Sequence, residues 1–264
     1  MPDSESARKE ALFREWKREE DIAHIHGWDF SHLSGRYTEE TDLPWNFADV
    51  IAKYVKPESR LLDMETGGGE FLLSLHHTPS RTAATEGYPP NVEVCKERLL
   101  PLGIDFQEAD GTKPLPFADR SFDVITNRHG DFVISELSRT LAPGGVFLTE
   151  QVGEDNDREL IELLLPGTPK AYPGLNLQNT AEKFQNAGFS VLESQEAFRP
   201  IRFYDVGALV WFARVLPWEF PGFSVESCFE NLWKAQRLLD GRGVLEGRIH
   251  RFWLAVQLSP TCSI

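Results

Sequence analysis

Three successive glycines follow a short apolar run in the segment LLDMETGGGE, residues 61–70. Glycine has no Cβ and adopts positive φ angles easily, so a turn of this kind lets the backbone approach a ligand closely. The dinucleotide-binding pattern G-x-G-x-x-G would require glycine at position 72, where this chain has Leu72. The segment therefore predicts a bound cofactor and weakens a nicotinamide interpretation. A glycine turn that holds no ligand is the alternative.

A carboxylate at the end of the next expected strand strengthens the cofactor interpretation. Glu86 lies nineteen residues after Gly67, counted as 86 minus 67, and follows the short run 82–85. A carboxylate only accepts hydrogen bonds, so it suits the two adjacent hydroxyl donors of a ribose. Each such charge-assisted bond is worth roughly 1.5 to 3 kcal/mol. Glu86 is therefore the expected ribose ligand, and a solvated surface glutamate is the alternative.

Two further polar groups follow later strands. Asp110 follows the expected strand 106–109 within the sequence EADG, and it can accept a hydrogen bond from an adenine amino group. His129 comes just after the expected strand 122–126, and an imidazole titrates near neutral pH. His129 is therefore the best-placed candidate for a general base. A histidine that bonds a loop carbonyl is an equally weighted alternative.

These groups need a scaffold that brings the ends of several strands to one edge. Apolar runs of strand length alternate with segments of helical period between residues 60 and 150. Such alternation indicates an α/β fold, with a parallel sheet built from right-handed crossovers. The expected strands are 60–64, 82–85, 106–109, 122–126, 146–150, 189–194 and 249–257, and the expected helices are 47–54, 71–77, 91–100, about 132–140 and 179–187.

Two segments outside this alternation have a different pattern. Residues 4–25 are charged with a sparse apolar stripe, which predicts an amphipathic helix, and the aromatic segment that follows, with Trp28, is interpreted as a lid. Residues 205–247 are helix-like and aromatic, which favours core packing of a helical insertion over a ligand box. We expect a lid at 1–44 and one domain at 45–264 that carries the insertion. Lid and insertion together are expected to build an apolar acceptor pocket.

Composition narrows the class of partner. The 264 residues include 41 acidic and 27 basic side chains, a formal net charge of −14, which disfavours nucleic acid and anionic membrane surfaces. No run approaches the ~18 apolar residues that span a bilayer, and the N-terminus lacks the pattern of a signal peptide, so a cytoplasmic protein is expected. Cys95, Cys228 and Cys262 are too scattered for a disulfide framework or a zinc site, and no metal is expected.

The order of these motifs resembles one family. LLDMETGGGE, the strand-end Glu86, EADG with LPFADRSFDVIT, and ELSRTLAPGGVFLTE are similar to motifs of class I S-adenosylmethionine-dependent methyltransferases of the methyltransferase-11 or -25 kind, over about residues 60–150. The resemblance implies a doubly wound, Rossmann-like sheet of seven strands, mostly parallel with an antiparallel last strand. It also implies S-adenosyl-L-methionine as cofactor and direct in-line transfer of its methyl group to a small, partly hydrophobic acceptor.

The resemblance also assigns roles to residues. Asp63 and the turn from Gly67 to Gly69 fall on the methionine end and the backbone cradle, and Glu86 falls on the ribose. Asp110 falls on the adenine, with Gly111 beside it. These assignments follow from the family motif and not from spacing alone.

Glu65 departs from the family pattern. The family usually has glycine at this position, and we interpret Glu65 as a contact to the amino acid part of the cofactor. Asn127 or Arg128 is expected to line the floor of the site where the fourth strand ends. The predicted cofactor-binding residues are thus Asp63, Glu65, Thr66, Gly67, Gly69, Glu86, Asp110, Gly111, Asn127 and Arg128.

Three other functions compete with this interpretation. An rRNA or tRNA methyltransferase has a related fold, but the net charge opposes it. A protein that binds S-adenosylmethionine without catalysis is permitted by Glu65 and by the lack of an obvious general base. A nicotinamide oxidoreductase is third. The sequence names neither the methyl acceptor nor the atom that is methylated, and it leaves the oligomeric state open.

Overall fold

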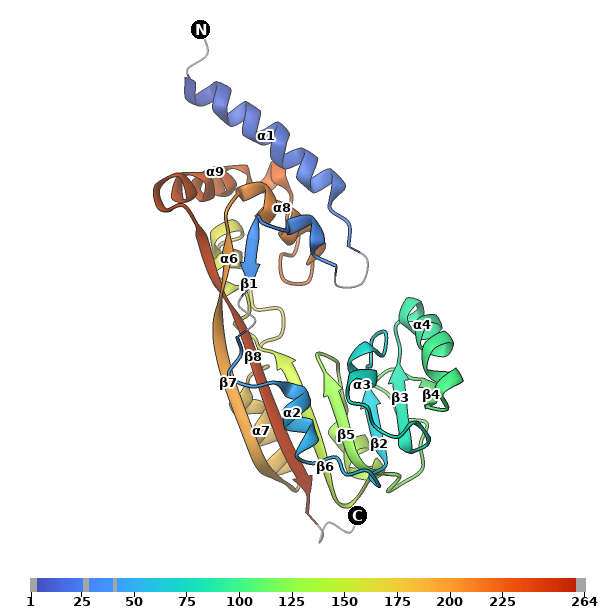
Figure 1. The fold of residues 1–264 in the computed structure, drawn as a ribbon. Coiled ribbons are helices and arrows are strands. Elements are labelled where there is room, and N and C mark those ends of the chain that lie inside the picture. The colour runs from blue at the N-terminus through green and yellow to red at the C-terminus, as the bar shows by residue number, and fades with distance from the viewer. Residues whose placement is uncertain (1–3, 26–28, 40–41, 260–264) are drawn as a thin grey trace. The chain divides into compact units, whose positions relative to one another are not determined.

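The chain forms two compact units, each of which is described by itself. A computed structural model describes residues 4–25, 29–39 and 42–259 (Figure 1). Trp28 and Cys262 therefore lie outside the described residues. Unit 1 comprises Met1–Leu43, Glu154–Pro173 and Phe198–His250, and unit 2 comprises Pro44–Gly153, Gly174–Ala197 and Arg251–Ile264.

Five parallel strands form the centre of unit 2. They pair in the order β6-β5-β2-β3-β4, and β8 pairs antiparallel with β6 between Arg251 and Gln257. Further along the sheet, β7 follows β8. The strands are β2 (Leu61–Met64), β3 (Thr82–Glu86), β4 (Asp105–Glu108), β5 (Phe122–Arg128), β6 (Leu141–Val152), β7 (Phe189–Phe203) and β8 (Leu245–Leu258).

Alternating side chains bury both faces of this sheet. Leu61 and Val124 pack on one face against α2 (Phe47–Ala52), α3 (Glu70–Ser74) and α4 (Pro89–Leu99). Their neighbours Leu62 and Ile125 pack on the other face against α5 (Ile134–Thr140) and α7 (Leu177–Asn186). Figure 1 accordingly shows α2 and α7 on opposite sides of the sheet. A strand that is covered on both faces is apolar at nearly every position, as β2 is.

The chain reverses its direction of strand addition between β2 and β5. It runs from β2 outward through β3 to β4, then returns to place β5 on the other side of β2. Asp63 lies opposite Thr126, and Met64 lies opposite Asn127, so the carboxyl ends of β2 and β5 are adjacent. Open α/β sheets bind ligands at such a reversal, outside the carboxyl ends of the strands.

Helices from distant parts of the sequence build unit 1 around one aromatic core. Trp16 and Leu33 from the N-terminal segment pack with Trp211, Phe212 and Phe220. The aromatic residues of the expected insertion are thus core residues, as favoured above, although Trp218 is 43% exposed. The helices of this unit are α1 (Ser4–Ile22), α6 (Arg158–Leu164), α8 (Val206–Val215) and α9 (Val225–Arg242).

The predicted kind of fold is confirmed, and the described residues form one strand more than expected. The additional strand, β1 (Tyr37–Glu39), pairs antiparallel with residues 201–203 of β7 within unit 1. Three residues are too few to show alternation, so this segment was expected to be loop. The helix α6 was also not anticipated, because its seven residues mix charged and apolar side chains. None of the described helices is both long and apolar enough to cross a membrane.

The aromatic cluster under α7 gives a test of the core of unit 2. Phe184 is fully buried, and its ring lies 5.7, 5.5 and 5.3 Å from the rings of Phe132, Phe147 and Phe189. Phe184→Ala should lower the free energy of unfolding by about 3 to 5 kcal/mol, because it removes buried surface and leaves a cavity. Urea unfolding followed by circular dichroism measures this. Leu192→Ala, at a position 39% exposed, is the control and should change stability by less than about 0.5 kcal/mol.

Candidate functional site

The glycine turn after β2 is open on one side and packed on the other. Gly67 and Gly69 have φ angles of 63° and 80°, a conformation that favours glycine. A Cβ added at Gly67 would meet no atom within 4 Å, whereas one at Gly69 would lie 3.0 Å from a side-chain carbon of Leu99. The turn therefore exposes backbone at Gly67 while Gly69 packs against α4.

Asp63 fixes this turn from inside the protein. Its carboxylate is buried, and it accepts hydrogen bonds from the hydroxyls of Thr66, at 2.6 Å, and Thr126, at 2.7 Å. Burial raises the pKa of Asp63 to about 6, although both hydroxyls favour the charged form. Asp63 and Thr66 thus hold the turn in place against β5, and neither oxygen of Asp63 is left without a partner.

Glu86 ties the end of β3 to the same turn. Its Oε2 accepts the backbone N–H of Gly67 at 2.7 Å, and its Oε1 accepts the N–H groups of Gly87 and Tyr88 at 3.0 and 2.8 Å. The residue is only 3% exposed. Because a carboxylate has about four acceptor positions, roughly one remains for a ligand. The structure therefore brings Glu86 and the glycine turn into direct contact.

Asp110 lies next to these groups, after β4. A Cβ added at Gly87 would lie 3.0 Å from Asp110 Cα, so the loops after β3 and β4 pack against each other. Asp110 Oδ1 accepts both the N–H and the hydroxyl of Thr112, and Lys113 lies 3.1 Å from Oδ2. These contacts lower the pKa of Asp110 to about 2, so the group is ionised at neutral pH.

Glu65 fills the space between three of these loops. Its φ angle is 53°, a left-handed conformation that favours glycine. Oε1 accepts the backbone N–H of Gly111 at 2.5 Å, beside Asp110. A Cβ added at Gly130 would lie 2.5 Å from Glu65 Cβ, so the loop after β5 also encloses this side chain. Burial, together with the carboxylates of Glu86, Asp110 and Asp131, raises the pKa of Glu65 to about 7.

Asn127 belongs to a buried network at the end of β5. Its Oδ1 accepts hydrogen bonds from Gln151 Nε2 at 2.8 Å and from the Thr149 hydroxyl at 3.1 Å. Gln151 also donates to the carbonyl of Gly130 at 3.0 Å. Asn127 is fully buried, so it positions the loop that follows and does not line an open surface.

Arg128 and His129 form a second cluster with a buried carboxylate, Glu150. Arg128 Nε donates to Glu150 Oε2 at 2.8 Å, and Trp45 Nε1 donates to Oε1 at 2.7 Å. His129, with φ of 59°, places Nε2 3.9 Å from Glu150 Oε2 and is 37% exposed at its side chain. Partial removal of the ring from water, together with the nearby Arg251 and Arg128, lowers the pKa of His129, so its imidazole is neutral at pH 7 and accepts a proton less readily than a free imidazole.

Sequence reasoning missed the role of Glu150. The sequence analysis names Glu150 only as the last position of the expected strand 146–150, whereas it predicts Glu86 as a ligand from its placement at a strand end. The same signal applied to Glu150. No cluster of three or more potential metal ligands occurs among the residues that the structure describes.

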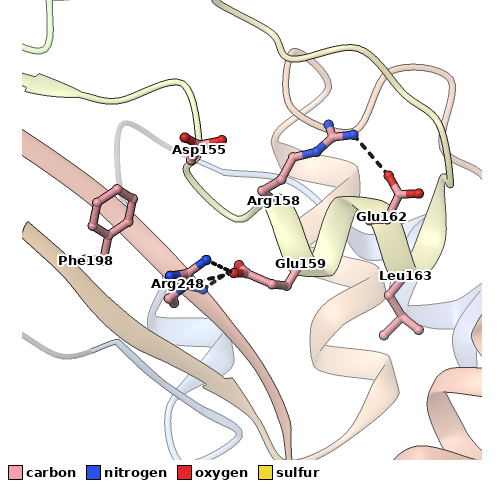
Figure 2. Close-up of a pocket in the computed structure, with 7 residues that line it drawn as sticks. All are labelled: Asp155, Arg158, Glu159, Glu162, Leu163, Phe198 and Arg248. Atoms are coloured by element: carbon pink, nitrogen blue, oxygen red, sulfur yellow. Dashed lines mark hydrogen bonds and ion pairs between the residues drawn. The ribbon is translucent and has the colours of Figure 1, made fainter. Parts of the chain in front are cut away.

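Two grooves lie elsewhere on the described surface. A groove of about 420 Å³ in unit 2 runs between α2 and β7, with Trp45, Lys53 and Glu193 in its lining. A groove of about 710 Å³ in unit 1 is mostly charged, and Figure 2 shows Arg158 paired with Glu162 and Arg248 paired with Glu159. The seven residues that line it are Asp155, Arg158, Glu159, Glu162, Leu163, Phe198 and Arg248.

Comparison with known proteins points to one family. The family described as a methyltransferase domain matches residues 62–149. A demethylmenaquinone methyltransferase of Thermus thermophilus is 29% identical over 164 residues, which are 55% of this chain and 68% of that protein. A phthiotriol/phenolphthiotriol dimycocerosates methyltransferase of Mycobacterium tuberculosis is 31% identical over 110 residues, which are 39% of this chain and only 40% of that protein's length.

A solved structure shows the same fold. A Bacillus halodurans protein, described as a candidate methyltransferase, has a TM-score of 0.57 at 16% identity and covers 81% of this chain and 99% of its own. The family match makes residues 62–149 a methyltransferase domain. The relatives named as methyltransferases support the class I S-adenosylmethionine-dependent family and an enzyme, and the solved structure supports the fold. The predicted family and enzyme class are confirmed. The family implies S-adenosylmethionine as the cofactor.

The free energy of unfolding should depend on pH through the protonation of Asp63. Because burial raises its pKa from 3.8 to about 6, the folded protein binds this proton more tightly than the unfolded chain does. The stabilising contribution is present below about pH 4 and is lost as pH rises through 6, by roughly 2 to 3 kcal/mol. The free energy of unfolding of the wild type minus that of Asp63→Asn should therefore fall over this range. The same difference for Asp119→Asn, at a side chain 74% exposed, should stay nearly flat.

Proposed function

We propose that unit 2 binds S-adenosylmethionine along the carboxyl ends of β2, β3 and β4 and transfers its methyl group to a small, partly hydrophobic acceptor. The observation that carries this proposal is the hydrogen bond from Gly67 N–H to Glu86 Oε2. It joins a glycine turn, suited to close backbone approach, to a carboxylate suited to ribose hydroxyls. Both lie beside the strand-order reversal, where such sheets bind ligands.

The residues at this edge fit most of the cofactor. Open space at the Cβ position of Gly67 allows a ligand to approach the turn, and Thr66 and Asp63 support it from below. Glu86 would accept from one ribose hydroxyl at its remaining position, and Asp110 would accept from the adenine amino group. Asn127 would act only by positioning the loop at 129–131. The fit is incomplete at Gly111, whose N–H is bonded to Glu65.

Methyl transfer requires mainly that the protein position the acceptor atom next to the methyl group. When bound, S-adenosylmethionine would supply a methyl carbon for in-line attack by an acceptor atom, with the carbon–sulfur bond breaking and S-adenosylhomocysteine as the leaving group. The chain would position that atom and exclude water, which accounts for much of the rate in reactions of this type. His129 would take a proton from the acceptor, because its imidazole is neutral at pH 7, although the contacts that lower its pKa also weaken it as a base.

An apolar acceptor is supported by the relatives and by composition. The two relatives are named for demethylmenaquinone and for phthiotriol dimycocerosates, both apolar molecules. The net charge of −14 opposes an RNA substrate. A transfer assay with a radiolabelled methyl group should give product with hydroxylated quinones or lipids and none with rRNA or tRNA. Binding of the cofactor without turnover on such a panel would favour the non-catalytic alternative, and methylated RNA would overturn the proposed acceptor.

Glu86 should determine cofactor affinity. Glu86→Gln removes the charge that strengthens a bond to ribose, so affinity for S-adenosylhomocysteine should fall about 10- to 150-fold, as the loss of roughly 1.5 to 3 kcal/mol requires. Isothermal titration calorimetry measures this, and thermal unfolding without ligand separates it from damage to the fold. Glu108→Gln, at an exposed carboxylate on the neighbouring strand, is the control and should bind normally. Equal affinity of the Glu86 variant and the wild type would contradict the assignment.

His129 should affect turnover and not cofactor binding. Asn tolerates the left-handed backbone at this position, so His129→Asn should lower kcat by about 10²- to 10⁴-fold with unchanged affinity for S-adenosylhomocysteine. The matched control is His76→Asn, at an exposed histidine with a φ angle of 52°. An unchanged kcat would remove His129 from the mechanism.

A further inference from the structure

The contact between Glu65 and Gly111 lies where the proposed function puts the adenine ring. Adenine carries an amino donor next to a ring nitrogen acceptor, so its edge matches a carboxylate next to a backbone N–H. Asp110 and Gly111 supply this pair from consecutive positions of the chain. The N–H of Gly111, however, already donates to Glu65 Oε1 at 2.5 Å. The structure thus shows the donor half of this recognition pair satisfied by the protein itself.

Glu65 is partly buried, and two loops approach its side chain closely. A Cβ at Gly130 would lie 2.5 and 2.7 Å from Glu65 Cβ and Cγ, and a Cβ at Gly111 would lie 3.0 Å from Oε1. Both loops therefore approach the side chain as closely as glycine permits. Glu65 therefore lies in contact with the loops that follow β4 and β5.

Electrostatics make this position costly for a carboxylate. Glu86 at the end of β3, Asp110 after β4 and Asp131 after β5 all repel a negative charge on Glu65. Asp110 is itself paired with Lys113. Burial and this repulsion raise the pKa of Glu65 to about 7, so a proton is bound there in part of the population at neutral pH. The left-handed backbone of Glu65 adds strain that a glycine would not have.

We propose that the Glu65 side chain occupies the nucleoside site. It accepts the hydrogen bond of the Gly111 N–H and must move away before the adenosyl group of the cofactor can bind. The inference rests on the proposed function and deepens it, because it turns a departure from the family motif into a determinant of cofactor affinity. Glu65 then competes with the cofactor. It is not a ligand of the cofactor's amino acid part.

Variants that remove the carboxyl group should bind the cofactor more tightly. Glu65→Gly and Glu65→Ala should each raise affinity for S-adenosylhomocysteine at least about tenfold, because Gly111 N–H is freed. Glu65→Gln keeps an oxygen that can accept from Gly111, so its affinity should stay within about threefold of the wild type. Isothermal titration calorimetry on the full chain measures all four proteins, and thermal unfolding without ligand checks that each is folded.

Proton release gives a second, independent readout. When Glu65 leaves a site that raises its pKa and enters water, it loses a proton, so binding to the wild type at pH 6 to 7 should release protons. Titrations in buffers of different ionisation enthalpy measure this release. Asp110 stays ionised over this range and contributes nothing to it. Glu65→Gln should bind without the release.

The outcomes separate this inference from the function on which it rests. Weaker or equal binding by Glu65→Gly and Glu65→Ala, with a wild type that binds, would overturn the inference and leave the proposed function standing. Weaker binding in particular would make Glu65 a contact to the cofactor. Failure of the wild type and of every folded variant to bind S-adenosylhomocysteine would overturn both.

Discussion

The buried carboxylate of Asp63 fixes the loops at the edge of the sheet where the cofactor is proposed to bind. Asp63 lies where the order of strands reverses, and its two oxygens accept hydroxyl donors from the glycine turn and from β5. Removing a carboxylate from water is unfavourable unless such bonds replace its hydration. The position of the turn relative to β5 is therefore fixed by Asp63, and Glu86, which bonds Gly67 N–H, is fixed with it.

Other carboxylates at the strand ends also serve the protein's own architecture. Glu86 accepts three backbone N–H groups, Glu150 accepts an indole and a guanidinium, and Glu65 accepts the N–H of Gly111. Each bond connects segments distant in the sequence or shapes a loop beside the site. The acidic character of the chain is thus partly structural, and any ligand at this edge shares acceptors that already have partners.

The sequence predicted the order of strands and helices because alternation of apolar residues is a local property. It also placed Glu86 beside the glycine turn, since both follow from where strands end. It could not place the Glu65 side chain, whose partner Gly111 is 46 residues away and is defined only by the folded backbone. Nor could it show that Asn127 is buried by Gln151, or that Trp45 binds Glu150. The β1 strand and the composition of unit 1 depend in the same way on pairing between remote segments.

The assembly of unit 1 from three stretches of chain has a consequence for biosynthesis. Trp16 on α1 shares its core with Trp211 on α8, and 195 residues separate them, counted as 211 minus 16. At ribosomal speeds of about 5–20 residues per second, α1 waits roughly 10 to 40 s for its partners to emerge. The strands β2 to β6, by contrast, lie within one continuous stretch and can pair during that interval. Nascent α1 thus spends this time without the apolar partners that cover Trp16 in the folded unit.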